Sequence, residues 1–324
     1  MEKGCKNSFS RLPRDPDQTH PWLLVSHGDD YQFHTFYDIS KNEYIKRNIP
    51  EFRYKQVAAT SYGWLLLIDY TIHPLQCCLV NITSKERIEL PHIEYESLST
   101  SSFFYECVLS KPPNDPYCYV LLVASCKDYL LFCRVGEEKF IKRPKQFEDD
   151  FFETATNFKG KIYAWMSVSG KLVEVDFVGP ELLLNELVND KGQLCQIPWP
   201  SPSNTYACED HLVDSCGELL LVHMNGYIHS REVSYFRIFK IKICEREWEE
   251  LRSIGDRAIF LCPIGSMSFL CTDKSRLKKN SIYYTRFGTT TNIYVYDIED
   301  RSKTLKKPCP TKGDIRPLMS WIVL

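Results

Sequence analysis

The sequence is organised around a unit of four short apolar segments that returns about every fifty residues. Its clearest copy spans residues 209–251, where segments rich in branched and aromatic residues are up to nine residues long. The breaks between these segments are polar or contain a glycine such as Gly217. This alternation of short apolar runs and turns predicts four antiparallel strands in each copy.

Successive copies of the unit begin near residues 56, 103, 152, 209 and 257. Repeats of this length with four strands are typical of propeller blades, because one small sheet cannot bury both of its faces alone. A further set of three strands precedes Pro50, and the segment 320–324 stands apart from any other set. We therefore expect residues 321–324 to supply the missing inner strand of the first blade.

The predicted fold is an all-β propeller of six four-stranded blades closed by the C-terminal strand. Seven blades remain the alternative, because the pattern is weak over residues 177–208 and 263–280. Within these stretches, residues 181–188 fit either a strand or a short helix, and residues 265–271 are ambiguous. Residues 1–20 are interpreted as an irregular lead-in and residues 21–324 as the propeller domain.

The composition argues against several classes of protein. With 40 basic and 42 acidic residues, the net charge is −2, whereas a nucleic-acid binder of this size is usually basic. No stretch approaches the length of a membrane span, and the first residues lack the apolar core of a secretory signal. Most of the fourteen cysteines lie in predicted apolar strands, which favours a reducing cytoplasm or nucleus.

The usual signatures of metal sites and catalysis are missing from the sequence. No Cys-x-x-Cys pair occurs, and the adjacent Cys77 and Cys78 would point to opposite faces of a strand. The stretch 265–268 lacks the second glycine of a nucleophile elbow, and no glycine-rich phosphate loop is present. We therefore expect a non-enzymatic protein with no metal and no cofactor. The rival interpretation is a propeller hydrolase with carboxylates that converge on the central channel.

Partner-binding residues are expected in the loops between the second and third strands of each blade. In a propeller these loops share one face with the loops that join successive blades. Exposed tyrosine, histidine and arginine on rigidly held loops are residue types that anchor protein partners. The segment 274–279 carries the most concentrated charge expected on that face and is suited to steer an acidic partner. The candidate residues are Tyr31, Tyr70, His73, His229, Arg231, Lys274, Arg276, Lys278 and Lys279.

A series of motifs, taken in order, resembles the pattern of a plant protein family. The motifs are GWLLL at 63–67, IELP at 88–91, FKGKIYA at 158–164, HLVDSCGELLLV at 211–222, WEEL at 248–251 and YDIED at 296–300. From about residue 20 onward, the sequence is similar to the β-propeller domain of plant KIB-type F-box proteins. The resemblance implies a propeller that recognises a protein target, commonly tied to a ubiquitin ligase through an amino-terminal F-box.

The sequence departs from this family pattern ahead of the propeller. An F-box is a bundle of helices with a leucine pattern, whereas residues 1–20 are mostly polar. We therefore expect a protein-recognition propeller without an F-box, with a target that the sequence does not identify and an indirect link to a ubiquitin ligase. A degenerate family copy without a retained partner is the further alternative.

Overall fold

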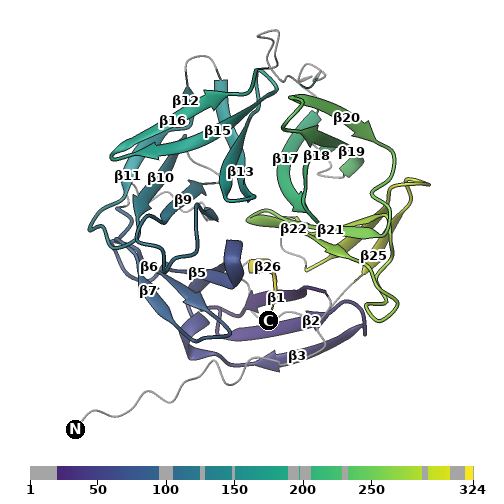
Figure 1. Ribbon diagram of the computed structural model, residues 1–324. Coiled ribbons are helices and arrows are strands. Elements are labelled where there is room, and N and C mark those ends of the chain that lie inside the picture. Colours follow the sequence, from purple (N-terminus) through teal and green to yellow (C-terminus); the bar gives the residue numbers. More distant parts are fainter. Residues whose placement is uncertain are drawn as a thin grey trace.

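The computed structural model describes residues 20–94, 105–124, 128–147, 150–188, 197, 206–227, 233–286, 291–306 and 318–323. In these residues, six small sheets stand around a central axis as the blades of a propeller (Figure 1). The prediction of six blades is confirmed. Four of the sheets have four strands, and two have a fifth strand.

Blade one combines strands from distant parts of the sequence. From the axis outward, its strands are β26 (Leu318–Ile322), β1 (Trp22–His27), β2 (Phe33–Asp38) and β3 (Glu43–Arg47). Leu23 of β1 lies opposite Trp321 of β26, in an antiparallel pairing. The predicted closure of the ring is therefore confirmed, with the closing strand placed slightly earlier than residues 321–324.

Trp321 fastens this closing strand to the neighbouring blade. Its side chain is only 1% exposed, and its Nε1 donates a hydrogen bond of 3.0 Å to the carbonyl oxygen of Leu261. Its ring meets Phe260 nearly edge-on, at 5.0 Å between the ring centroids. Aromatic pairs in this geometry contribute stability beyond the area that they bury.

Blades two to five are antiparallel meanders in which the chain passes from the axis outward. Blade two holds β4 (Lys55–Ala59), β5 (Trp64–Asp69), β6 (Gln76–Asn81) and β7 (Arg87–Glu89), and blade three holds β8 (Tyr105–Leu109), β9 (Tyr119–Ala124), β10 (Tyr129–Arg134) and β11 (Ile141–Pro144). Blade four holds β12 (Gln146–Phe147), β13 (Asp150–Phe158), β14 (Lys161–Met166), β15 (Lys171–Val178) and β16 (Glu181–Glu186), and blade five holds β17 (Tyr206–Ser215), β18 (Glu218–Tyr227), β19 (Val233–Lys242) and β20 (Glu247–Leu251). The strand interpretation of residues 181–188 is thus the correct one.

Two short 3-10 turns, η2 (Pro50–Phe52) and η3 (Ser61–Gly63), flank β4.

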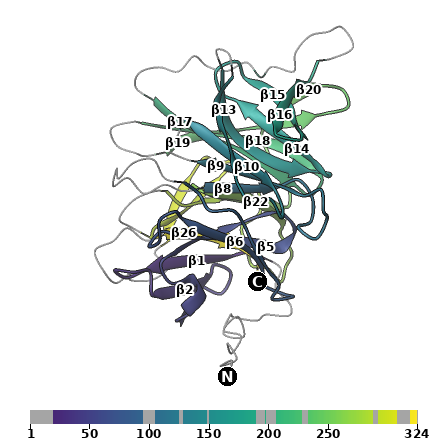
Figure 2. The same ribbon diagram turned by 90° about the vertical axis from the view of Figure 1, so that its left-hand side faces the viewer.

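Figure 2 shows the ring from the side, with β1 and β2 of blade one far from β15 and β20 of blades four and five.

Strand β5 shows why the blades need one another. All five residues from Trp64 to Ile68 are buried. Trp64, Leu66 and Ile68 pack into one hydrophobic cluster, whereas Leu65 and Leu67 pack into a second cluster on the opposite face. Because neighbouring blades cover both faces, the strand is an uninterrupted apolar run. Each fully buried side chain of this kind contributes about 1.5–3 kcal/mol.

Blade six differs from the predicted meander. Its strands are β22 (Gly265–Leu270), β21 (Arg257–Cys262), β23 (Ser281–Tyr284), β24 (Ile293–Asp297) and β25 (Lys303–Lys306), from the axis outward. The ambiguous residues 265–271 form the innermost strand, because the chain turns back toward the axis after Cys262. Strand β23 then runs parallel to β21, with Ala258 opposite Ser281. The chain must therefore return over residues 271–280 to the end of the blade where β21 begins.

Candidate functional site

The connections at one end of blades one and two lie side by side. The backbone N–H of Tyr54, between the two blades, donates to the carbonyl oxygen of Asp30 at 2.9 Å, and the N–H of Tyr70 donates to the carbonyl oxygen of Tyr54 at 3.2 Å. The turn after β1, the segment between the blades and the loop after β5 therefore share one face, as predicted. We define the tyrosine patch as Asp30, Tyr31, Arg53, Tyr54, Tyr70, Ile72 and His73.

The tyrosine patch is held in place by polar contacts and by its backbone. The Nε of Arg53 donates to the carboxylate of Asp30 at 2.8 Å, and the guanidinium lies 4.9 Å from the centre of the Tyr54 ring. Tyr31 and Tyr54 have φ values of 54° and 60°, in the left-handed region that few residues other than glycine adopt. Such backbone strain persists only where the surroundings enforce it, and it is frequent at binding sites.

Three of the residues predicted from the sequence belong to the tyrosine patch. Tyr31 and Tyr70 are half-buried, and burial raises the pKa of Tyr31, so its hydroxyl stays protonated. His73 is exposed beside Ile72, which is 43% exposed. The sequence reasoning missed Arg53 and Tyr54, although it expected the loops between blades on this face. His229 and Arg231 lie outside the described residues.

The basic segment 274–279 lies at the opposite end of the ring from the tyrosine patch, so the expectation that it shares a face with Tyr31, Tyr70 and His73 is wrong. The N–H of Cys271 donates to the carbonyl oxygen of Asp256 at 2.7 Å, just before β21. The first residue of β21, Arg257, contacts the β17–β18 hairpin of blade five, which is at the opposite end of β18 from residue 227. The innermost position of β22 is the reason, because it brings the chain back to this end.

The basic segment is anchored to the blade rather than free. Lys278 pairs with Asp297 at 2.6 Å, and Lys279 pairs with Asp256 at 3.0 Å. Between the charged residues, Ser275 is fully buried, and the side chain of Leu277 is also buried. Lys274 and Arg276 are exposed. The structure thus places Lys274, Arg276, Lys278 and Lys279 together, but not with the tyrosine patch.

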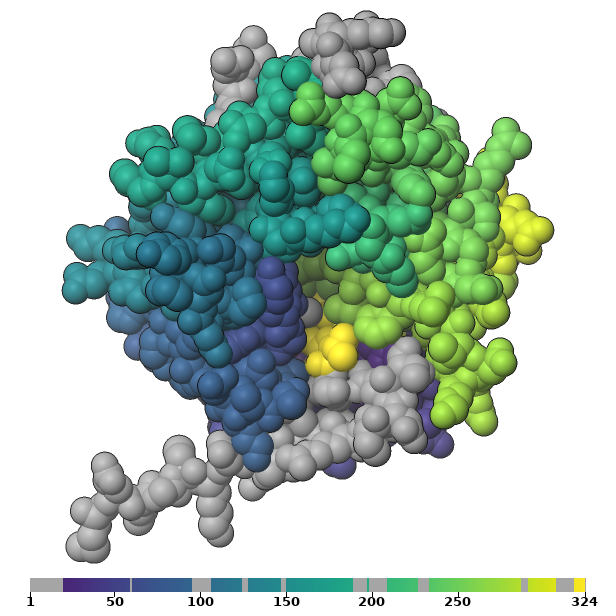
Figure 3. All heavy atoms as spheres, in the orientation of Figure 1, coloured from purple at the N-terminus to yellow at the C-terminus, as the bar shows by residue number. Residues whose placement is uncertain are grey.

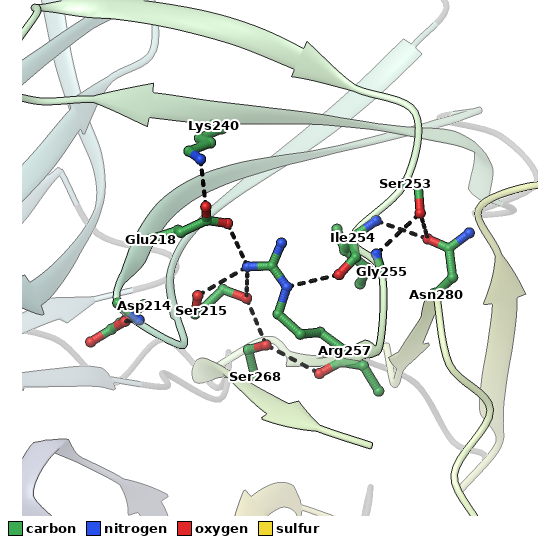
Figure 4. A network of polar contacts seen from close by, with 12 residues as sticks. Asp214, Ser215, Glu218, Lys240, Ser253, Ile254, Gly255, Arg257, Ser268 and Asn280 are labelled. Carbon is green, nitrogen blue, oxygen red and sulfur yellow. Dashed lines mark hydrogen bonds and ion pairs between the residues drawn. The ribbon is translucent and has the colours of Figure 1, made fainter. Parts of the chain in front are cut away.

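A polar network joins blade five to blade six at this end (Figure 4). The Nη1 of Arg257 donates to the Glu218 carboxylate at 2.7 Å and to the carbonyl oxygen of Ser215 at 3.0 Å. Its Nε donates to the carbonyl oxygen of Ile254 at 2.8 Å, and Glu218 also accepts from Lys240. Because the guanidinium serves three partners in a fixed fork, it sets the position of β21 against blade five.

A cavity of 530 Å³ lies on the axis, and Figure 3 shows the hollow beside the yellow atoms of the C-terminal strand. Its acidic lining residues are Glu106 and Asp214, and its lining includes no histidine among the described residues. Asp214 accepts a hydrogen bond from the N–H of Gly217 at 3.1 Å, so it serves the hairpin turn.

Glu106 is the most perturbed carboxyl group of the channel. Burial raises its pKa to about 7, although a hydrogen bond from Thr154 and the charge of Lys145 act in the opposite direction. Burial also raises the pKa of Glu153 and Glu209 on the next two inner strands, but neither residue lines the cavity. Within the described residues, no group of three or more histidine, cysteine or acidic side chains is arranged to hold a metal ion.

The ring of six blades defines the chain as a β-propeller. More specifically, the chain belongs to the KIB1-4 β-propeller family, whose model matches residues 36–297. It is 25% identical over 165 residues to the F-box protein At2g26160 of Arabidopsis thaliana. That match covers 48% of this chain and 46% of the relative, so it spans about half of the relative's length.

Solved structures show only a low similarity to this chain. TolB from Acinetobacter baumannii has a TM-score of 0.45 and 10% identity, over 96% of this chain and 68% of that chain. A chain of the nidogen/laminin complex has a TM-score of 0.42 and 10% identity, over 94% of this chain and 98% of that chain. At TM-scores below 0.5, neither a shared fold nor a shared function follows from these similarities. The described residues include no helix that is long and apolar enough to cross a membrane.

Proposed function

We propose that this chain is a non-catalytic protein-binding propeller and that its tyrosine patch receives the target of a ubiquitin ligase. The family membership and the F-box relative support the class of function. The observation that carries the proposal is the patch itself, where the left-handed Tyr31 and Tyr54 share one face of the ring with the exposed Ile72. Aromatic side chains that are already ordered lose little conformational entropy when a partner binds.

The chemistry of the channel favours binding over hydrolysis. A glycosidase-type mechanism needs two carboxyl groups that flank one bond, one of them ionised. In the described cavity, Asp214 is committed to a turn and Glu106 is the remaining acidic lining residue. The proposed work of the protein is therefore recognition, with transfer of ubiquitin left to other subunits of a ligase.

The test is quantitative affinity purification from plant cells with a double variant, Tyr31→Asn and Ile72→Asp. Asparagine tolerates the left-handed backbone at Tyr31, so the fold is retained while the aromatic contact is lost. The matched control is Tyr117→Asn with Leu305→Asp, which changes residues that are 65% and 48% exposed elsewhere on the ring. We expect the patch variant to lose at least tenfold of the recovered target and the control to lose none.

Two results would overturn the proposal. Equal recovery of the same partners by the patch variant would remove the tyrosine patch from recognition. Loss of an activity through Glu106→Gln, with partner recovery intact, would favour the channel hydrolase instead. A melting temperature measured for each variant shows that any loss is not caused by unfolding.

A further inference from the structure

A groove of 750 Å³ separates the outer strands of blades five and six. These two blades lie at the right of the ring in Figure 1. One wall comes from β19 and the end of β20, and the other comes from β24 and the turn after it. None of its lining residues belongs to the tyrosine patch or to the channel. A volume of this size is sufficient for a small ligand or for a few residues of a peptide.

The floor of the groove is apolar and already packed. The ring of Phe236 lies 4.9 Å from that of Tyr296 and 5.2 Å from that of Tyr284, between centroids. Ile238 and Tyr296 are each only 2% exposed. Because these side chains are fixed by the blades beneath them, an apolar residue of a partner could bind without ordering them first.

The rim of the groove carries two arginines that have no fixed partner. Arg237 and Glu250 form a two-pronged ion pair, with N···O distances of 2.8 and 2.9 Å, so that guanidinium is satisfied. Arg252 and Arg301 are exposed, and neither forms an ion pair or a side-chain hydrogen bond in the described part of the chain. Both lie close enough to Glu250 for their charges to help lower the pKa of its carboxyl group, after the larger effect of Arg237.

The groove lies next to the end of the basic segment. The Oγ of Ser253 donates to the side-chain oxygen of Asn280 at 3.1 Å, and the N–H of Ile298 donates to the carbonyl oxygen of Asn280 at 3.1 Å. These bonds hold the residues beside Arg252 and Arg301 against the end of segment 271–280. The end of the basic segment therefore lies beside the residues that flank the groove.

The rim also bears carboxylates, and these select among anionic ligands. Glu250 and Glu299 lie on the groove together with the arginines. A continuous phosphate backbone would bring one negative charge after another past these carboxylates. A peptide can space its acidic residues to reach the arginines and present an apolar side chain between them.

We propose that this groove binds an extended acidic peptide segment of a partner protein, with an apolar side chain on the Phe236–Tyr296 floor and carboxylates on Arg252 and Arg301. The inference deepens the proposed function and rests on it only in that the partner is a protein. The groove adds a second contact to the tyrosine patch, so both would contribute to the affinity for one target.

The test measures fluorescence anisotropy of a labelled polyglutamate peptide with one central phenylalanine, titrated with the purified chain. The double variant Arg252→Glu with Arg301→Glu should weaken binding at least tenfold. The conservative variant Arg252→Lys with Arg301→Lys should weaken it only two- to threefold, because lysine keeps the charge and loses the fork. Binding should fall as salt rises from low to physiological concentration.

The matched control reverses the same number of charges elsewhere. Lys46→Glu with Lys159→Glu alters two exposed lysines on blades one and four and should change the affinity less than twofold. A tenfold loss in this control would show that only the net charge of the chain matters, and it would overturn the proposal. Equal binding of the same peptide built with lysine in place of glutamate would show that the arginines do not recognise carboxylates, and it would overturn the proposal as well. Tighter binding of a single-stranded RNA probe at the same site would overturn it as well.

The tyrosine patch variant separates this proposal from the proposed function. Tyr31→Asn with Ile72→Asp should bind the peptide as the unaltered chain does, because the patch lies on blades one and two. If the peptide fails to bind while the patch variant still loses its target in cells, the groove proposal falls and the proposed function stands. If the peptide binds through Arg252 and Arg301 while the patch variant still recovers its target in full, the groove proposal stands and the proposed role of the tyrosine patch falls.

Discussion

Blade one and blade six both depart from the four-stranded meander, but they do so in opposite ways. Blade one takes its innermost strand, β26, from a distant part of the sequence, whereas blade six takes its innermost strand, β22, from the hairpin beside β21. Blade one encloses polar groups such as His34, which is fully buried. Blade six instead turns charged residues such as Arg257 and Arg301 toward its neighbour and toward solvent. The strand next to the axis can thus come from a neighbouring or from a distant part of the sequence. The two arrangements depend on different residues for their stability.

The largest effect is expected at the long-range closure. Trp321→Ala should lower the free energy of unfolding by about 3–5 kcal/mol, because a fully buried aromatic side chain leaves a cavity between blades one and six. Trp248→Ala is the matched control, since Trp248 is half-buried in outer strand β20 and should cost about 1–2 kcal/mol. Urea denaturation measures both values, and equal losses would mean that β26 is not what fixes blade one.

An intermediate effect is expected on acidification of blade one. Burial lowers the pKa of His34 to about 4, and the nearby His27 acts in the same direction. Between pH 6.5 and pH 4, the unfolded chain binds a proton on this histidine that the folded chain does not bind. The full stability is therefore present above the ordinary pKa of 6.5 and is lost as the pH falls toward 4. Between pH 7.5 and 5, this group should cost about 2 kcal/mol.

The variant His34→Asn isolates that contribution, because the amide does not titrate and can still accept from the N–H of Ile49. His211 of blade five also has a pKa lowered by burial to about 4, so the unaltered chain has more than one acid-sensitive group. The measured quantity is therefore the difference between unaltered chain and variant in the urea midpoint at the two pH values. An identical pH dependence would place the acid sensitivity outside blade one.

The smallest effect is expected at the junction of blades five and six. Arg257→Met should lower stability by about 1–2 kcal/mol, because two carbonyl groups and Glu218 lose a donor while Lys240 still balances the Glu218 charge. Arg143→Met removes an exposed ion pair with Glu181 on blades three and four, and it should cost less than about 0.5 kcal/mol. Similar losses in the two variants would contradict the positioning role of Arg257.

Most of the ring follows from the sequence because blade strands are buried on both faces. Uninterrupted apolar runs such as residues 64–68 predict strands without any knowledge of their neighbours. The lone segment around Trp321 predicted closure because an unpaired inner edge has to be filled. The order of strands in blade six could not be predicted, because Gly265 and Ser266 give a weak strand pattern. The local sequence also contains no signal that the next strand lies toward the axis.

The binding residues were less predictable than the fold. Tyr31 and Tyr70 were found because loop position and residue type suffice for them. Arg53 and Tyr54 belong to the patch only through contacts made between blades. The basic segment lies at the opposite end of the ring from its predicted place because β22 is the innermost strand of blade six. Residues whose neighbours are set by register and strand order require coordinates, whereas residues on a simple loop do not.

The pairing of β26 with β1 also governs how the chain can mature during its synthesis. While residues between Trp22 and Leu318 leave the ribosome, the hydrogen-bonding edge of β1 has no partner strand. Such an edge is open to pairing with other nascent chains, and a contact so distant in sequence forms slowly. Closure of the ring therefore has to wait until β26 has been synthesised.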